Sequence, residues 1–454
     1  MSRVLVLATT TGYQTRAFGE AAERLGVELV FATDRCHVID DPWQDGAIPI
    51  RFHDEDHSVK TVLDSVRFRP IDGVLAVGDR PTVIAARVAE RLGLPGHSPS
   101  AAEVARDKER TRARLRDAGL PGPWFVPSPL YADPAALVPT IDFPCVIKPV
   151  ALSGSRGVMR ADNAEQFLAA HARLQALMRQ PDIRAEQNEA HERLLVEGFI
   201  AGREFALEGV LHHCGLTVLA LFDKPDPLDG PFFEETIYVT PSALDAAAQA
   251  LVTETVARAA AAIGLTHGPI HAECRVTPST LRQAQGRPEP SRGTTGSGPA
   301  QVFVLEVAAR PIGGLCARAL RFEKRGRESL AEDPPISLEE LLLRHALGES
   351  PEKWGRESIA SGVMMIPIPH RGVFRHVEGL DEARAVAGID DIRVTAKADQ
   401  LLVPLPEGAS YLGFIFARAD RPADVDRALR AAHGHLRFTV DPEIPVLRYN
   451  RSHG

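Results

Sequence analysis

Two short apolar segments, residues 270–276 and 302–307, constrain the fold of this chain more than any other feature. Each has the length and composition of a buried β-strand, and each carries one carboxylate. Side chains alternate between the faces of a strand, so His271, Glu273 and Arg275 should face away from the apolar residues of the first segment. The residues between the two segments are rich in Pro, Gly, Ser and Thr and predict a polar insertion within an antiparallel hairpin.

Such a hairpin would bring Glu273 and Glu306 side by side. Two facing carboxylates repel each other and are costly to bury, so a cation is expected beside them. Carboxylate oxygens suit Mg²⁺, which takes its other oxygens from water and phosphates. Two alternatives stay open: a register that separates the carboxylates, or neutralisation by Arg275 and Arg310. Arg310 would share the face of Glu306 if the strand continued.

The first residues of the chain predict a doubly wound parallel sheet. Residues 4–8 and 27–32 form strands around a helix at 16–25, which is a βαβ unit. The segment lacks GxGxxG, which disfavours a nicotinamide oxidoreductase. A further strand, residues 73–77, ends just before Asp79, and ligands in open α/β sheets bind at such strand ends. Asp79 would therefore face a substrate, or alternatively cap the helix that follows.

A lysine followed by a flexible loop lies near the middle of the chain. Residues 143–150 predict a strand that carries Lys148, and residues 151–158 (ALSGSRGV) follow it with small side chains. Such a loop can fold its N–H groups over a phosphate, and a simple glycine hairpin is the alternative. It does not match the Walker pattern. The charged segment 105–119 predicts a solvated helix, and the polar segment 220–238 predicts a functional loop.

Composition excludes several classes of protein. The net charge is −8, so no basic surface points to nucleic acid as a partner. The five cysteines are far apart and form no CxxC, which argues against a disulfide framework or a structural zinc site and fits the reducing cytoplasm. The N-terminal apolar stretch is too short for a signal peptide. No run reaches the roughly 18 apolar residues of a membrane helix. The 454 residues predict roughly three domains.

Several of these features occur together in the order found in ATP-grasp enzymes. They are Lys108, Lys148 with its small-residue loop, VEGFIAGREF at 196–205, the Glu273 strand and LEVAARPIGG at 305–314. The chain resembles that superfamily over nearly all of its length. The segment FDKPDPLDGPFFEETIYVTPS and the C-terminal region, which alternates strands and helices, are similar to the L-amino-acid ligase group of carboxylate–amine ligases.

The resemblance implies an α/β and α+β multidomain chain with the ATP-grasp fold. Residues 1–104 would form an N-terminal doubly wound (pre-ATP-grasp) domain, 105–350 the ATP-grasp domain, and 351–454 a C-terminal α+β domain of the L-amino-acid ligase type. Within the ATP-grasp domain, 105–195 would be the small subdomain and 196–350 the large one, with a polar insertion at 277–300. The sequence assigns no chemistry to the C-terminal domain.

The resemblance also implies an ATP site. The two lysines would contact phosphates, residues 153–157 would close over the β- and γ-phosphates, backbone groups of residues 198–200 would read the adenine edge, and Glu204 would lie near the ribose. The implied ATP-binding residues are Lys108, Lys148, Ser153, Gly154, Ser155, Gly157, Glu197, Gly198, Phe199, Ile200 and Glu204.

Catalytic and substrate roles follow from the same resemblance. Glu273 and Glu306 would hold Mg²⁺ (or Mn²⁺) between the phosphates, and Arg310 would steady the transferred phosphoryl group or the acyl intermediate. Lys224 would lie over the triphosphate, with a solvated loop lysine as the alternative. Gly313 and Gly314 would help to hold the carboxylate substrate, as would Asp79.

One position departs from the ATP-grasp pattern. Many members carry Glu-x-Asn-x-Arg at the last metal site, whereas Ala308 occupies the Asn position here and cannot ligate a metal. The second metal would then depend on Glu306, the phosphates and water.

The implied activity is ATP-dependent formation of an amide (dipeptide-like) bond through an acyl phosphate, with release of ADP and phosphate. The implied partners are a small-molecule carboxylate, an L-amino acid in this group, and an amine, with no nucleic acid and no membrane. Oligomeric state stays open, with a homodimer as one option. Two alternatives are a biotin-carboxylase-like or purine-pathway ATP-grasp ligase, which the C-terminal domain fits poorly, and an ATP-binding sensor or assembly protein, which Ala308 and the insertion motivate.

Overall fold

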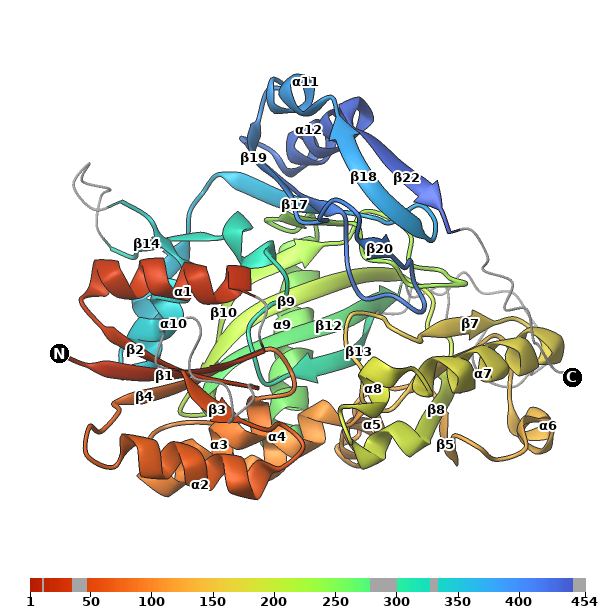
Figure 1. The fold of residues 1–454 in the computed structure, drawn as a ribbon, viewed down its shortest axis with the longest axis horizontal. Helices are drawn as coiled ribbons and strands as arrows, with labels where there is room; N and C mark the ends of the chain where they lie inside the picture. The colour runs from red at the N-terminus through yellow and green to blue at the C-terminus, as the bar shows by residue number, and fades with distance from the viewer. Residues whose placement is uncertain (10–11, 35–46, 278–299, 327–333, 444–454) are drawn as a thin grey trace, which may run out of the picture.

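The computed structural model describes residues 1–9, 12–34, 47–277, 300–326 and 334–443. The predicted polar insertion at 277–300 therefore lies almost entirely outside the described residues. The described residues form one eight-stranded sheet, two four-stranded sheets and two three-stranded sheets (Figure 1). Within these residues, every helix is too short or too polar to cross a membrane.

The N-terminal sheet is parallel, as the βαβ pattern predicts, with the order β3-β2-β1-β4. Alternate residues of β1 enter two different cores, because α1 and α10 cover one face of the sheet and α2 and α3 cover the other (Figure 1). The elements are β1 Arg3–Ala8, α1 Gly12–Leu25, β2 Glu28–Asp34, β3 Ile48–Ile50, α2 Glu55–Val66, β4 Gly73–Val77, α3 Thr82–Leu92 and α10 Leu338–Ala346.

The charged segment 105–119 does not form one helix, contrary to the prediction. The chain forms α4 (Pro99–Arg106), breaks at Asp107 and continues as α5 (Lys108–Asp117). The break occurs because Asp107 has an extended backbone and its carboxylate accepts the N–H of Arg110, which caps α5. The helix is also not fully solvated, because Arg112 is buried.

A four-stranded antiparallel sheet follows, in the order β5-β8-β6-β7. Its strands are β5 Phe125–Pro129, β6 Cys145–Pro149, β7 Met159–Ala161 and β8 Arg193–Gly198. Helix α7 (Ala164–Met178) covers one face with an apolar core that includes Phe167 and Leu174. Lys148 lies on the other face of this sheet, which lines the cleft described below.

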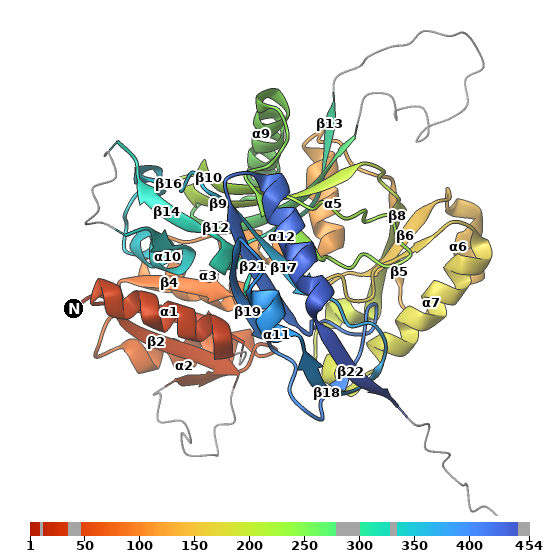
Figure 2. The same cartoon turned by 90° about the horizontal axis from the view of Figure 1, so that it is seen from above.

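The eight-stranded sheet has the order β13-β12-β9-β10-β11-β17-β21-β19. Helix α9 (Ala246–Ile263) packs against β9, β12 and β13, and α12 (Pro422–His435) packs against β17 and β21 further along the sheet (Figure 2). The sheet thus crosses the predicted domain boundary at residue 351. Its strands are β9 Arg203–His212, β10 Gly215–Asp223, β11 Ile237–Thr240, β12 Gly268–Thr277, β13 Gln301–Ala308, β17 Ala360–Ile366, β19 Ile389–Val394 and β21 Gly413–Ala419.

The pairing of β12 with β13 confirms the predicted antiparallel hairpin and places Glu273 opposite Glu306. A β-bulge lies beside this pair: Cys274 is opposite Val304, so Leu305 is an extra residue. Before the bulge Val304 packs toward α9, and after it Val307 does. The bulge therefore turns Glu306 onto the face of Glu273, away from the apolar core.

The remaining elements form small sheets and short helices around this frame. One three-stranded sheet has the order β15-β14-β16 and the other β20-β18-β22. Their strands are β14 Arg321–Lys324, β15 Ile336–Ser337, β16 Trp354–Arg356, β18 Gly372–Glu378, β20 Leu401–Leu402 and β22 Arg437–Pro442. Among the described residues, the short helices are α6 Pro134–Leu137, α8 Pro181–Arg184, α11 Leu380–Arg384 and four 3₁₀ turns at Val138–Thr140, Glu189–Glu192, Cys316–Ala319 and Pro351–Lys353.

Candidate active site

A cleft with a volume of about 620 Å³ is lined by the four-stranded antiparallel sheet, the eight-stranded sheet, the carboxyl end of β4 and C-terminal loops. This size suits a small-molecule ligand. All the predicted site residues line it except Gly157 and Lys224. Those that do are Asp79, Lys108, Lys148, Ser153, Gly154, Ser155, Glu197, Gly198, Phe199, Ile200, Glu204, Glu273, Glu306, Arg310, Gly313 and Gly314.

Lys148 of β6 forms a buried ion pair with Glu197 of the neighbouring strand β8. Arg112 of α5 also binds this carboxylate, with Nε 2.7 Å from Oε2 and Nη2 3.2 Å from Oε1. Burial lowers the pKa of Lys148 to about 8, although Glu197 acts in the opposite direction. Burial alone would raise the pKa of Glu197, but Arg112 and Lys148 outweigh it and bring that pKa to about 2.

The sequence predicted Glu197 in the adenine hinge and did not predict this ion pair. It also missed Arg112, which lay within a helix interpreted as solvated. A signal was available, because Thr111 and Arg112 lie four and three residues before Leu115, which is the spacing of one buried helix face.

The ammonium group of Lys108 lies 3.6 Å from Glu306 Oε2 and donates to the carbonyl of Leu152 at 2.6 Å. Among the described residues, Arg275 and Arg310 form ion pairs with other carboxylates and not with Glu273 or Glu306. The alternative in which these two arginines neutralise the facing carboxylates is therefore wrong.

The loop at 151–158 follows β6 and places Ser153, Gly154 and Ser155 at the cleft. Its backbone takes left-handed conformations, with φ of 64° at Gly154 and 54° at Ser155. Gly157 lies away from the cleft: its N–H donates to the carbonyl of Pro406 at 2.8 Å. A Cβ on Gly157 would meet Leu174 at 3.0 Å. Gly157 therefore serves packing and joins this loop to the C-terminal region.

The predicted adenine hinge is the end of β8 and the residues after it. Gly198 and Phe199 donate their N–H groups to Trp124 and Pro144, and the carbonyl of Ile200 accepts from Arg275 at 2.5 Å. These three backbone groups are thus already paired, and the prediction that this segment reads adenine has to rest on its other groups.

Aromatic rings line the same end of the cleft. The rings of Phe199 and Phe233 are stacked, with 6.4 Å between centroids. The guanidinium of Arg275 lies 5.1 Å from the Phe199 centroid and 5.8 Å from that of Phe233. This flat, partly cationic surface suits a planar heterocycle.

A cluster of three carboxylates, Glu204, Glu235 and Glu273, surrounds the ammonium group of Lys224. Lys224 Nζ is 2.8 Å from Glu204 Oε1 and 3.4 Å from Glu273 Oε1, and it also contacts Glu235. Burial alone would lower the pKa of Lys224, but the three carboxylates raise it well above its usual value. The alternative of a solvated loop lysine is wrong, because Lys224 is buried directly after β10.

Glu204 binds a second cation besides Lys224, because Arg275 Nε lies 3.0 Å from its carboxylate. The sequence placed Glu204 near the ribose and did not predict that it pairs with two cations. Glu235 was noted only as part of a polar loop and given no role. Its pKa is raised by burial and by Glu273.

His271 and Glu208 form a further buried pair that the sequence did not predict. His271 Nδ1 lies 3.1 Å from Glu208 Oε2, and His271 Nε2 lies 3.7 Å from Glu273. Burial would lower the pKa of His271, but Glu208 and Glu273 outweigh it and raise that pKa to about 9. Glu208 also accepts the N–H of Ile312 at 3.1 Å. The pair therefore fixes the segment that carries Gly313 and Gly314. In the β12–β13 register, His271 is opposite Ala308.

Arg310 binds Asp79 with two hydrogen bonds, Nε to Oδ1 at 2.9 Å and Nη2 to Oδ2 at 3.1 Å. Asp79 does not cap α3, whose N-cap is Pro81 without a side-chain bond. Burial would raise the pKa of Asp79, but Arg310 outweighs it and lowers that pKa. Asp79, which the sequence predicted to face a substrate, thus orients the guanidinium of Arg310. Gly314 needs its left-handed φ of 62°, and a Cβ on Gly313 would meet no atom within 4 Å.

The C-terminal region completes the cleft, although the sequence assigned it no chemistry. Gln400, Tyr411 and Phe414 line it together with Met365 of β17. The sequence of this region carries no site pattern, so these residues are revealed only by the fold, which places β17 next to β11 and β21 next to β17.

The chain carries stretches that match ATP-grasp domains, in agreement with the fold and the site. Three stretches match known families: residues 19–96 the ATP-grasp N-terminal domain, 141–283 the ATP-grasp domain, and 364–441 the L-amino acid ligase C-terminal domain 2. The last match extends the similarity to the L-amino-acid ligase group. The crystal structure of the L-amino acid ligase from Bacillus licheniformis has a TM-score of 0.77 and 25% identity, covering 97% of this chain and 99% of that one.

Curated relatives match over shorter lengths. Carnosine synthase 1 of Gallus gallus is 30% identical over 254 residues, which is 52% of this chain and 26% of that protein. Alanine–anticapsin ligase of Bacillus subtilis is 26% identical over 235 residues, 49% of each protein. The chain thus matches between about a quarter and a half of the length of these relatives. Biotin carboxylase from Campylobacter jejuni, at 15% identity and a TM-score of 0.61, shares the fold.

Proposed function

We propose that this protein is an ATP-dependent carboxylate–amine ligase that joins an amino acid to an amine. A carboxylate is a poor electrophile because its negative charge shields the carbon. Transfer of the γ-phosphoryl group of ATP to a carboxylate oxygen gives an acyl phosphate and ADP. The amine nitrogen then attacks the acyl carbon, phosphate leaves, and the nitrogen loses a proton. The products are an amide, ADP and phosphate.

One observation carries this proposal: the β12–β13 register places Glu273 opposite Glu306 inside a cleft lined by Lys108 and Lys148, with the buried Lys224 in contact with Glu273. Lys108 lies on the Glu306 side and Lys224 on the Glu273 side, while Lys148 approaches from β6. Alternating carboxylates and ammonium groups suit a polyphosphate with its counter-ion, since catalysis of phosphoryl transfer rests on positioning and charge neutralisation.

The donor set fits Mg²⁺ or Mn²⁺, which prefer carboxylate oxygens. Glu273 and Glu306 would hold the ion, with Glu235 close to Glu273. Bound there, the ion would neutralise charge on the phosphate oxygens. Lys224 now occupies the carboxylate cluster, so we infer that its ammonium group turns from Glu273 toward phosphate oxygens when nucleotide binds.

The other residues have roles that follow from their contacts. Arg310, held by Asp79, would bind the transferred phosphoryl group or the acyl carboxylate at the end of the cleft near Gly313. The loop at 153–155 would cover the β- and γ-phosphates and exclude water from the acyl phosphate. Phe199 and Phe233 would hold the adenine ring.

The substrates proposed are an L-amino acid as the acid and a second amino acid as the amine, because carnosine synthase and alanine–anticapsin ligase are similar to about half of this chain and residues 364–441 match an L-amino acid ligase domain. Tyr411, Phe414 and Met365 give the substrate end of the cleft an apolar wall. We also keep the domain division 1–104, 105–350 and 351–454 as a proposal.

The test is phosphate release with Mg·ATP against the common amino acids, supplied singly and in pairs. Release that requires a particular pair, and that Glu306→Ala abolishes, is the expected result. Mass spectrometry of the mixture should find the amide of that pair. Tight ATP binding without release from any pair would contradict the dipeptide proposal.

A second candidate is an ATP-binding sensor or assembly protein. Ala308 favours it, because this buried residue faces His271 and supplies no metal ligand beside Glu306. Such a protein would bind ATP and release no ADP in response to any acid or amine.

A further inference from the structure

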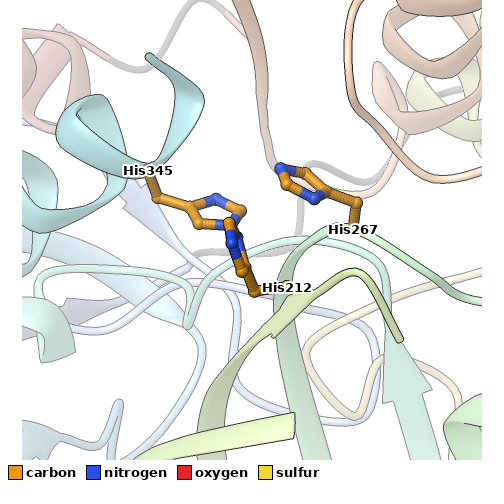
Figure 3. Close-up of side chains that lie close together, drawn as sticks. All are labelled: His212, His267 and His345. Carbon is orange, nitrogen blue, oxygen red and sulfur yellow. The ribbon is translucent and has the colours of Figure 1, made fainter. Parts of the chain in front are cut away.

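Three histidines that come from distant parts of the chain meet outside the cleft. His212 ends β9, His267 directly precedes β12, and His345 lies in the last turn of α10 (Figure 3). One nitrogen from each lies within 4.8 Å of the other two. We call these three residues the histidine cluster. None of them lines the cleft of the candidate active site.

The contacts within the cluster are close. His212 Nδ1 lies 3.3 Å from His345 Nε2, and the rings of His267 and His345 stack with 4.4 Å between centroids. His267 and His345 are buried, and His212 is partly exposed. Burial and neighbouring imidazoles lower the pKa of His267 to about 4 and that of His345 to about 3.

One polar atom of the cluster is left without a partner. His267 Nδ1 is buried and makes no hydrogen bond with any residue that the structure describes. Buried polar atoms are almost always paired, and an exception calls for a water or an ion. His97 nearby needs neither, because its Nδ1 accepts the N–H of Thr266 at 3.3 Å and its Nε2 lies 3.2 Å from the carbonyl of Pro269.

We propose that His212, His267 and His345 bind one divalent transition-metal ion through one nitrogen each, with Zn²⁺ as the expected ion. In a tetrahedral zinc site with Zn–N distances of about 2.05 Å, two ligand nitrogens lie about 3.3 Å apart. The nitrogens of His212 and His345 already have this separation. The remaining separations, at most 4.8 Å, have to shorten by about 1.5 Å or less, and the stacked rings of His267 and His345 have to tilt apart, because the lone pair of an imidazole nitrogen lies in the ring plane.

The chemistry of the cluster selects the ion. Neutral imidazole suits Zn²⁺, Ni²⁺ and Cu²⁺, whereas Mg²⁺ and Mn²⁺ prefer the carboxylates of the cleft. A water molecule would take the fourth position. The sequence argued against structural zinc because the cysteines form no pair, and that argument does not reach a site built only from histidines.

The site would connect two parts of the fold. His212 and His267 belong to the eight-stranded sheet, while α10 covers the N-terminal sheet and approaches β4 so closely that a Cβ on Gly73 would lie 2.5 Å from the carbonyl of Ala346. The ion would therefore hold the sheet that carries Glu273 against the sheet that ends at Asp79. His267 directly precedes β12, and Glu273 lies six residues further on in this strand, a distance of roughly 20 Å. The histidine cluster and the carboxylate site of the cleft are therefore separate.

The experiment uses the full-length protein without a polyhistidine tag, freed of metal with a chelator. Zn²⁺ is titrated in competition with a chromophoric chelator, in the presence of millimolar Mg²⁺ to fill the carboxylate site. The expected result is one Zn²⁺ per chain and a higher melting temperature. Co²⁺ in its place should give the visible absorption of a tetrahedral complex.

Matched variants locate the ion. His345→Gln and the milder His212→Gln should lose zinc affinity about 100-fold or more, because loss of an outer partner alone costs roughly 10–100-fold. His171→Gln should keep it, since His171 is a buried histidine outside the cluster. Glu306→Gln should also keep it.

Circular dichroism of each metal-free variant separates misfolding from ligand loss, and His212→Gln decides the matter if His345→Gln does not fold. Absence of zinc binding at micromolar concentration in the wild-type protein would overturn the proposal. An unchanged zinc affinity in His212→Gln would also overturn the proposal. A loss of zinc affinity in Glu306→Gln would place the ion in the carboxylate site and would overturn it as well.

Discussion

Glu197 holds two buried cations, and its replacement tests the electrostatics of the candidate site. Glu197→Gln keeps the shape of the side chain and removes its charge, which leaves Lys148 and Arg112 buried without a counter-ion. The pKa of Glu197 falls from 4.5 to about 2 in the folded protein. At 1.36 kcal/mol per pKa unit, the ionised carboxylate contributes about 3 kcal/mol to stability. Removing one partner of a buried pair costs a similar roughly 3–5 kcal/mol.

The sign of the pH dependence follows from this lowered pKa. The contribution is fully present above pH 4.5 and is lost as the pH falls toward 2. The wild-type protein should therefore be about 3 kcal/mol more stable than Glu197→Gln at pH 7, and the difference should narrow by about 2 kcal/mol between pH 4.5 and pH 3. Urea unfolding followed by tryptophan fluorescence measures it, because the Trp124 carbonyl accepts the N–H of Gly198 beside Glu197.

The same variant has a kinetic consequence. Glu197 raises the pKa of Lys148 against the effects of burial, Arg112 and Lys108, so its removal lowers that pKa below about 8. The kcat/KM for ATP, which reports free-enzyme pKa values, should fall above about pH 8 in the wild type and at lower pH in the variant. Lys148→Arg should show no such limb. A stability difference under about 1 kcal/mol that does not change with pH, with an unmoved alkaline limb, would refute this reasoning.

Three further predictions follow from the site. Asp79→Asn removes the charge that orients Arg310, so we expect a loss of about 1–3 kcal/mol of stability. In steady-state kinetics the KM for the acid should rise more than the KM for ATP. Equal increases in both KM values would contradict this role. Gly198→Ala puts a Cβ 2.7 Å from Trp124 Nε1 and should lower the melting temperature and weaken ATP binding, measured by calorimetry, whereas Gly122→Ala, whose Cβ meets no atom within 4 Å, should do neither. Ala308→Asn crowds a buried position opposite His271 and should cost about 1–3 kcal/mol in thermal unfolding without lowering the Mg²⁺ requirement; a stable variant that needs less Mg²⁺ would show that this position is open to the metal.

Much of the fold was predictable because it depends on local patterns. The apolar runs at 4–8 and 73–77 are buried strands, and the βαβ pattern of the first residues predicts the parallel sheet that contains them. The alternation in 270–276 correctly separated the core-facing residues from His271, Glu273 and Arg275. The break at Asp107 was missed, because a single cap outweighed the helical pattern around it.

The site was predictable only in part. The antiparallel pairing of the strands that carry Glu273 and Glu306 came from their apolar composition and from the polar segment between them, which are properties of the sequence. The β-bulge at Leu305 that turns Glu306 to the cleft has no sequence signal, since Leu305 looks like any other core residue. The partners of the charged groups were also missed, because each lies on an element distant in the chain.

The sequence by itself determined which chemistry this protein can hold: carboxylates on adjacent strands, lysines before a small-residue loop, and glycines after Arg310. The tertiary structure alone decided which of these side chains meet. Arg310 pairs with Asp79 across 231 positions of sequence, Arg112 with Glu197 across 85, and His212 meets His345 across 133. The physical reason is that strand and helix periodicity depends on neighbours in the chain, whereas an ion pair depends on distance in space, which only the packing of the sheets sets.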